Sequence, residues 1–156
     1  MIWKIAERKR GSDKSRLTGK GTRLLAILGT TLAATVGVTA VASAAPAGCA
    51  SGYACFWEDH SYVTDGSPYN EVRFYMYYTD FNYLNYTTNK DAHDNVSSLY
   101  NNGNSQSIYV YKNENFGGQA FGLSKTVGDN DLSNSSGGAP GGFNDSIDSG
   151  CFTGWC

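Results

Sequence analysis

Positive charge is scarce in most of this sequence. Of the 12 Lys and Arg residues, eight lie in residues 1–44, and the other four are Arg73, Lys90, Lys112 and Lys125. Residues 45–156 keep 12 of the 14 acidic residues, so their net charge is about −8. Nucleic acids and anionic membranes attract clustered cations. The composition therefore argues against nucleic acid and against a membrane surface as partners of this part of the chain.

The motifs of common enzyme classes are also missing. The sequence contains no H-E-x-x-H, no G-x-S-x-G and no catalytic Cys/His pairing. The two histidines, His60 and His93, stand apart, and no C-x-x-C pair provides zinc ligands. The neighbouring acids Glu58 and Asp59 are more typical of a solvated turn than of a glycosidase pair. We therefore expect a protein that binds and is not an enzyme.

The first 44 residues have the features of a secretory signal peptide. A basic segment, residues 1–23, precedes Leu24–Ala42, a stretch without any charged residue. Small residues end this stretch, and cleavage is expected after Ala44. The alternatives are an uncleaved membrane anchor and a lipidated Cys49. The prediction is a secreted, extracellular protein with no membrane attachment after the signal peptide is cleaved.

Short alternating segments with aromatic corners occur after the signal peptide. In residues 108–111, Ile and Val alternate with two tyrosines, which is the two-residue period of a strand. Four residues separate Tyr111 from Phe116, and Gly118 follows two positions later. We expect the chain to fold back so that Phe116 stacks on Tyr111, with glycine adopting a positive φ.

The same pattern occurs upstream in a weaker form. Trp57 and Tyr62 have the same spacing, although no glycine stands at the matching position. A strand is expected over Glu71–Tyr78, and the order of strand, corner, strand, loop, Asp/Ser-rich segment and strand occurs twice, at about 53–100 and 107–152. Each copy is too small to bury a sheet face alone. The sequence therefore predicts an all-β sandwich of two Greek-key motifs.

All four cysteines lie in the part of the chain that is expected to be exported. An even number of cysteines in an oxidising compartment indicates two disulfides. Three pairings exist for four cysteines, and proximity in sequence favours Cys49–Cys55 and Cys151–Cys156.

The second corner and a later acidic segment resemble one known superfamily. Tyr111-x4-Phe116-x-Gly118, followed by Asn-Asp-Ser-Ile-Asp-Ser at 144–149, is similar to the Greek-key signature of the βγ-crystallins. In that superfamily the acidic segment supplies oxygen ligands to calcium, which implies as ligands Asn144, Ser146 and Asp148 in the second copy and Asn95 and Ser97 in the first. The resemblance implies that the protein needs no cofactor to function, but that it can bind calcium. The alternative is that these residues only cap turns and close the Greek key.

The start of the mature chain resembles a more specific family. Cys49-x5-Cys55-Phe-Trp-Glu-Asp is similar to the opening of secreted bacterial peptidase inhibitors of the metalloproteinase-inhibitor type, which have a βγ-crystallin-like fold. The resemblance implies that residues 45–156 form a monomeric inhibitor domain. Its partner would be an extracellular metallopeptidase of the thermolysin type, whose active site the inhibitor blocks.

The resemblance also implies a reactive site. Carried over by position, the inhibitory loop would be the second disulfide loop, with Cys151–Phe152 as its reactive bond. A disulfide-closed loop loses little ordering entropy on binding, and Phe152 would fill an apolar pocket of the peptidase. The alternative is that this disulfide only staples the final strand. For the whole protein, the alternative is a calcium-stabilised module that binds a glycan or a cell surface, stacking on tyrosines 75, 77, 78, 83 and 86.

Overall fold

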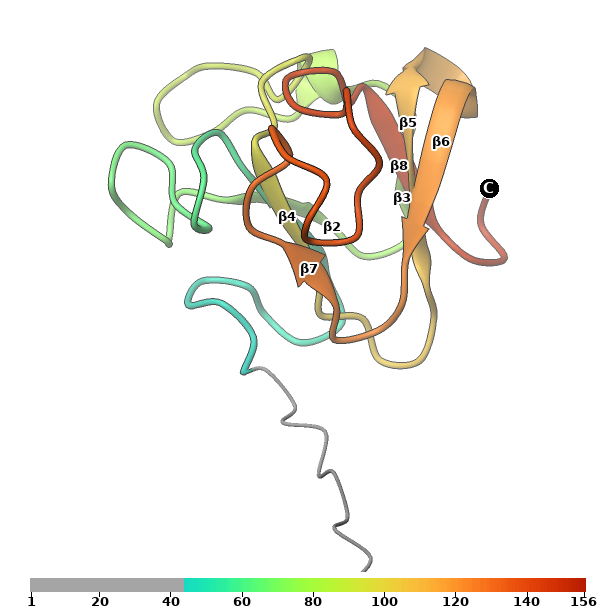
Figure 1. Ribbon diagram of the computed structural model, residues 1–156, viewed down its shortest axis with the longest axis horizontal. Helices are drawn as coiled ribbons and strands as arrows, with labels where there is room; N and C mark the ends of the chain where they lie inside the picture. Colours follow the sequence, from blue (N-terminus) through green and yellow to red (C-terminus); the bar gives the residue numbers. More distant parts are fainter. Residues whose placement is uncertain (1–43) are drawn as a thin grey trace, which may run out of the picture. The chain divides into compact units, whose positions relative to one another are not determined.

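The computed structural model describes residues 44–156, whose strands form two antiparallel sheets of four strands each (Figure 1). The first sheet has the order β2-β1-β4-β7, with β2 at Val72–Phe74, β1 at Ala54–Trp57, β4 at Ser98–Asn101 and β7 at Gly128–Asp129. The second sheet has the order β3-β8-β5-β6, with β3 at Tyr77–Tyr78, β8 at Ser149–Phe152, β5 at Ile108–Asn113 and β6 at Gly117–Leu123. Two short 3-10 helices are η1 at Phe81–Tyr83 and η2 at Glu114–Phe116.

The predicted signal peptide occupies residues 1–44 and, apart from Ala44, lies outside the described residues. Among residues 44–156, no helix is both long enough and apolar enough to cross a membrane.

The two motifs exchange one strand each. β3 follows β2 in the chain but pairs with β8 of the second motif, and β7 follows β6 but pairs with β4 of the first motif. Each sheet therefore contains three strands of one motif and one strand of the other. This arrangement confirms the prediction of an all-β sandwich of two Greek-key motifs, and it makes the two sheets depend on each other for their edges.

The strand expected over Glu71–Tyr78 is two strands in the structure. β2 ends at Phe74, the chain bends at Tyr75 and Met76, and β3 begins at Tyr77. The prediction of one strand was wrong because this segment passes from the first sheet to the second. A change of sheet requires a bend, and the period-two pattern of side chains continues across it.

The core lies between the sheets and follows the alternation of the strands. Ile108 and Val110 are almost fully buried, whereas Tyr109 between them is 42% exposed. Aromatic rings from both motifs fill most of the remaining space, namely Phe56, Phe74, Phe81, Phe121, Phe143 and Phe152. Burial of each such side chain contributes about 1.5–3 kcal/mol, so the joint core is a major source of stability.

Both aromatic corners are present and are built alike. The ring centroids of Tyr111 and Phe116 lie 5.6 Å apart, and those of Trp57 and Tyr62 lie 5.2 Å apart. Gly118 has a φ of +76°, and a Cβ atom there would lie 2.9 Å from Asn113 Nδ2.

A serine at the start of each motif's last strand holds the corner in place. The Phe116 N–H donates to Ser149 Oγ at 3.1 Å, and the Tyr62 N–H donates to Ser98 Oγ at 3.2 Å. Each hydroxyl in turn donates to a backbone carbonyl within the same corner, that of Asn113 for Ser149 and that of Asp59 for Ser98. The recurrence of these bonds gives both corners a structural role.

Candidate functional site

Both local disulfides form. The Cα atoms of Cys49 and Cys55 lie 5.7 Å apart, and those of Cys151 and Cys156 lie 5.5 Å apart, within the usual range for a disulfide. All four cysteines are paired. Of the three pairings, the structure therefore has the one that sequence proximity favours.

The bond Cys151–Phe152 does not lie on an accessible loop. Cys151 and Phe152 are 0% and 2% exposed and belong to β8, which is paired with β3 on one side and β5 on the other. The Phe152 ring packs edge-on against Phe74 with centroids 5.9 Å apart, and its N–H donates to the Met76 carbonyl. A peptidase binds an extended strand through its free backbone groups, and here these groups are paired within the sheet. The hypothesis that Phe152 enters a peptidase pocket is therefore wrong for this fold.

The exposed part of the second disulfide loop is a tight turn after β8. The Trp155 N–H donates to the Phe152 carbonyl at 3.0 Å, and Gly154 has a φ of +94°, which closes the turn. The Thr153 N–H donates to the Ser107 carbonyl at 2.9 Å and ties the turn to the domain. The turn is too compact to mimic an extended substrate, but it presents Trp155, which is 47% exposed.

The two segments that were predicted to bind calcium, one in each motif, are joined by hydrogen bonds. Ser97 Oγ donates to Asp145 Oδ1 at 3.0 Å, and the Asp145 N–H donates to the Val96 carbonyl. Asn144 Nδ2 donates to the other carboxylate oxygen of Asp145 at 2.6 Å. The side-chain oxygen Oδ1 of Asn144 is buried without a protein partner. Carboxylate, hydroxyl and amide oxygens together are ligands that suit calcium.

Two other predicted ligands are used differently. Asn95 Nδ2 donates to the carbonyls of His93 and Asp91, which fixes the turn before β4. Ser146 Oγ donates to the Asn144 carbonyl. These two side chains serve the local turns, as the alternative interpretation of the segment expects.

Asp148, the remaining predicted ligand, is held by a histidine. The Asp148 side chain is 5% exposed, and its carboxylate accepts a hydrogen bond from His93 Nδ1. This hydrogen bond raises the pKa of His93, and the nearby Asp94 and Asp91 add to the effect. The raised pKa favours the protonated imidazole, whose positive charge would lie beside Asp148, where the resemblance expects a metal ion. Among residues 44–156, no three His, Cys, Asp or Glu side chains converge as a metal-binding group. The donors fit a calcium ion at Asp145 and Ser97 and do not fit one at Asp148.

A partly buried tyrosine, Tyr62, and a fully buried one, Tyr86, lie near acidic residues. Burial raises the pKa of Tyr62 to about 12, and the negative charge of Asp129 adds to this shift. Burial also raises the pKa of Tyr86, whose hydroxyl donates to the Asn95 carbonyl, and Glu58 adds to the effect. These phenols are therefore neutral structural groups. Tyr86 is 2% exposed, which removes it from the proposed stacking surface.

The five tyrosines proposed from sequence as a stacking surface are not all exposed, and the proposal left out the exposed Tyr109. Tyr75, Tyr77 and Tyr83 are exposed, whereas Tyr78 packs against the core. Tyr109 is exposed on β5. The alternation of residues 108–111 placed Tyr109 on the outer face, but that signal does not say whether a second layer covers the face.

The strand exchange and the two serine-fixed corners define a βγ-crystallin-like domain. The chain belongs to peptidase inhibitor family I36, whose model matches residues 42–123. This match ends at Leu123, so the second disulfide lies beyond it. No curated protein matches the sequence.

Solved structures with a similar fold are βγ-crystallins. A structure from work on the evolution of the eye lens βγ-crystallin domain fold is 19% identical, with 70% of this chain and 91% of that chain covered and a TM-score of 0.49. A βγ-crystallin from Ciona intestinalis is 19% identical, with coverage of 65% and 99% and a TM-score of 0.46. A βγ-crystallin domain from Clostridium beijerinckii is 22% identical, with coverage of 64% and 94% and a TM-score of 0.42. The fold assignment itself rests on the strand order.

Proposed function

We propose that this chain is a secreted inhibitor of extracellular metallopeptidases of the thermolysin type and acts by blocking the active-site cleft. The observation that carries the proposal is membership of a peptidase inhibitor family over residues 42–123, which makes a peptidase the expected partner. The metallopeptidase class is supported by the likeness of the Cys49-x5-Cys55 opening to metalloproteinase inhibitors. Family membership likewise supports a binding role without catalysis.

Blockage by a rigid surface suits this domain. Two disulfides and two mutually dependent sheets fix the backbone before binding, so little ordering entropy is lost in a complex. The paired strand β8 offers no extended bond for cleavage. Inhibition would therefore be reversible occupation of the cleft, with the inhibitor left intact.

Export is supported by the basic and apolar segments of residues 1–44 and by the disulfides, which persist in oxidising compartments. The exported protein should begin at Ala45, which N-terminal sequencing would test. A net charge of about −8 favours a soluble monomer and disfavours nucleic acid as a partner.

A titration tests the proposal directly. The oxidised protein, residues 45–156, is added to thermolysin at a fixed concentration, and hydrolysis of a peptide substrate is followed. The expected result is stoichiometric loss of activity, with no effect on a serine peptidase under the same conditions. Full thermolysin activity at a large excess of the protein would rule out this target class.

The second candidate function is a calcium-stabilised module that binds a glycan or a cell surface. The unpartnered Asn144 Oδ1 beside the Ser97–Asp145 pair favours it, because these oxygens suit a hard cation. Retention on an insoluble polysaccharide in calcium, and release by chelator, is the result that it predicts.

A further inference from the structure

The outer faces of the two sheets differ, although the motifs are built alike. On the first sheet, Cys55, Trp57 and Tyr100 point away from the core and are at most 3% exposed. The Cys49–Cys55 disulfide, Tyr53 and Tyr62 pack against them and form a second layer. This outer face is therefore already occupied by the chain itself.

The outer face of the second sheet is covered less completely: its outward-facing Ser149 and Cys151 are buried, but the two tyrosines in register with Cys151 are exposed. The register of this sheet aligns Tyr77 with Cys151 and Cys151 with Tyr109, so the three side chains form a row on one face. Tyr77 and Tyr109 are 47% and 42% exposed. A Cβ atom at Gly122 would lie 3.0 Å from Tyr109, so the Tyr109 ring lies over this glycine.

Two further aromatic rings extend this row, and a third aromatic residue, Trp155, lies in the adjoining disulfide-closed turn. The Phe116 ring lies 6.2 Å from that of Tyr77 and 5.6 Å from that of Tyr111. The Cys151–Cys156 disulfide ties the turn that carries Trp155 to the same sheet. We call the resulting surface the outer aromatic face; it consists of Tyr77, Tyr109, Tyr111, Phe116 and Trp155.

Charge sets this face apart from the remaining surface. The residues that share its outward direction on the strands carry no charge, namely Tyr77, Tyr109, Tyr111, Ala120, Gly122, Ser149 and Cys151. Residues 45–156 contain 12 acidic residues, and one of them, Glu114, begins the short helix η2 that Phe116 ends. The strands of this face thus present no charged side chain outward, as is typical of the central part of a protein–protein interface.

We propose that the outer aromatic face is the surface that docks the target peptidase. This inference rests on the proposed inhibitory function. Four of its five aromatics, all except Trp155, lie within the residues matched by the peptidase inhibitor family, whereas Cys151–Phe152 lies outside. Tyr and Trp are the residues most enriched at interface positions that carry the binding energy. They are presented here by paired strands and a disulfide-closed turn, which keeps the ordering cost of binding low.

Two other occupants are less consistent with these observations. A second copy of the chain would bring together two molecules that each carry a net charge of about −8. A glycan would stack on the rings, but it would not account for a peptidase inhibitor family match. Both are outcomes that the experiment distinguishes.

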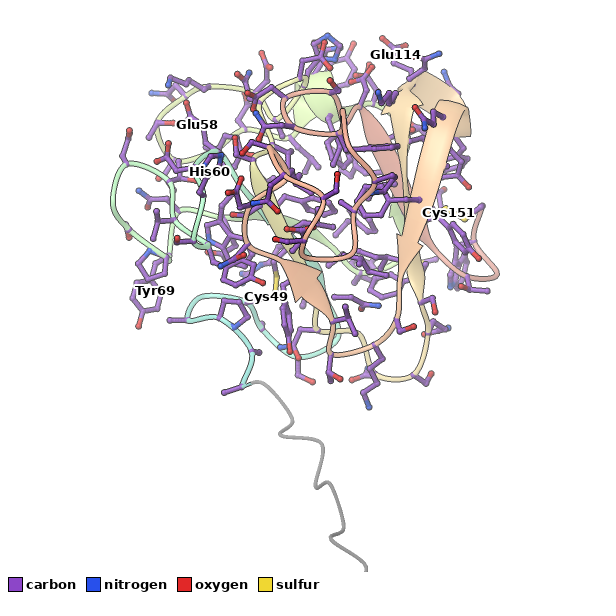
Figure 2. All side chains as sticks on the ribbon, in the orientation of Figure 1. Cys49, Glu58, His60, Tyr69, Glu114 and Cys151 are labelled. Carbon is purple, nitrogen blue, oxygen red and sulfur yellow. A yellow bond between two sulfur atoms is a disulfide. The ribbon has the colours of Figure 1, made fainter. Side chains whose placement is uncertain are left out.

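Three substitutions test the face, namely Tyr109→Ser, Tyr77→Ser and Trp155→Ser. The matched control is Tyr69→Ser, since Tyr69 is 70% exposed and lies on the opposite side of the domain from Cys151 (Figure 2). The inhibition constant for thermolysin should rise about tenfold or more for each face variant. It should change less than about twofold for the control. Melting temperatures check folding, and Trp155→Ser, in the exposed turn after β8, provides a second test if a tyrosine variant unfolds.

The outcomes separate the two proposals. If the native protein inhibits thermolysin and the folded face variants inhibit equally well, the docking face is wrong and the inhibitory function stands. If the native protein inhibits no metallopeptidase, the proposed function and the docking face fall together. If the variants lose only dimerisation or only polysaccharide binding, with inhibition unchanged, the face belongs to another partner and the inference is overturned.

Discussion

Ser97 Oγ donates to Asp145 Oδ1 at 3.0 Å, across 48 positions of sequence. The serine belongs to the first motif and the aspartate to the second, so this bond joins the two Greek keys beside the Asp/Ser-rich segments. Ser97 is 6% exposed, which leaves little solvent to replace a lost partner.

Ser97→Ala should reduce the free energy of unfolding by about 0.5–1.5 kcal/mol, because the buried Ser97 hydroxyl no longer donates to the exposed Asp145 carboxylate. Urea denaturation followed by circular dichroism measures the change. Ser105→Ala, at an exposed serine, is the control and should cost less than about 0.5 kcal/mol. Equal values for the two variants would contradict a joining role for the Ser97–Asp145 bond.

Calcium should raise the melting temperature if the second candidate function holds. The ion would be held by Asp145, Ser97 and Asn144 Oδ1, and it would stabilise the folded state by mass action. Differential scanning calorimetry with calcium and with chelator measures the shift, and Asp145→Ala should abolish it. Asp65→Ala, at an exposed turn, should keep it. If the native protein had the same melting temperature with calcium and with chelator, the calcium-binding hypothesis would be wrong.

Phe152→Leu should destabilise the domain without a matching loss of inhibition. The ring packs against Phe74 in the core, and even truncation to alanine at such sites costs about 3–5 kcal/mol, so leucine should cost less. Denaturation gives the stability, and the thermolysin assay gives the inhibition constant at a temperature where the variant is folded. Mass spectrometry after long incubation should find Cys151–Phe152 intact. Cleavage there, or selective loss of inhibition in folded Phe152→Leu, would restore the reactive-bond hypothesis.

Alkaline pH should destabilise the domain through its buried tyrosines. Burial raises the pKa of Tyr62 to about 12 and also raises those of Tyr86 and Tyr100. In the unfolded chain these phenols ionise near pH 10, so between pH 10 and 12 the unfolded state has released protons that the folded state retains. The free energy of unfolding therefore falls as pH rises through this range and is unaffected by these groups well below pH 10.

Tyr62→Phe tests this pH dependence. The variant removes one ionising group, so the decline in stability above pH 10 should become shallower, whereas Tyr69→Phe, at an exposed ring, should leave it unchanged. Ultraviolet absorbance of tyrosinate should show the exposed tyrosines ionising before the buried ones. Ionisation of all tyrosines in one step near pH 10, with the fold intact, would refute the burial argument.

Several features of this protein could be predicted from local sequence. The alternation at Ile108–Tyr111 predicted which side chains are buried, because a strand places successive residues on opposite faces whatever it pairs with. The spacing of Tyr111 and Phe116 predicted the corner, and the short separations of the cysteines predicted their pairing. Each of these relationships spans only a few residues, so local geometry is sufficient for it.

Other features depended on contacts between distant segments. The change of sheet within Glu71–Tyr78 depends on the affinity of β3 for β8, which lies more than seventy positions later. Phe152 is buried because strands pair with β8 on both sides. The hydrogen bond between His93 and Asp148 joins residues 55 positions apart. Trp57 on the first sheet is covered by Tyr53 and Tyr62, whereas Tyr109 on the second sheet is exposed because no such side chains cover it. Local patterns give the direction of each side chain, but only long-range packing determines what that side chain meets, and this is why the fold was predictable and the reactive bond was not.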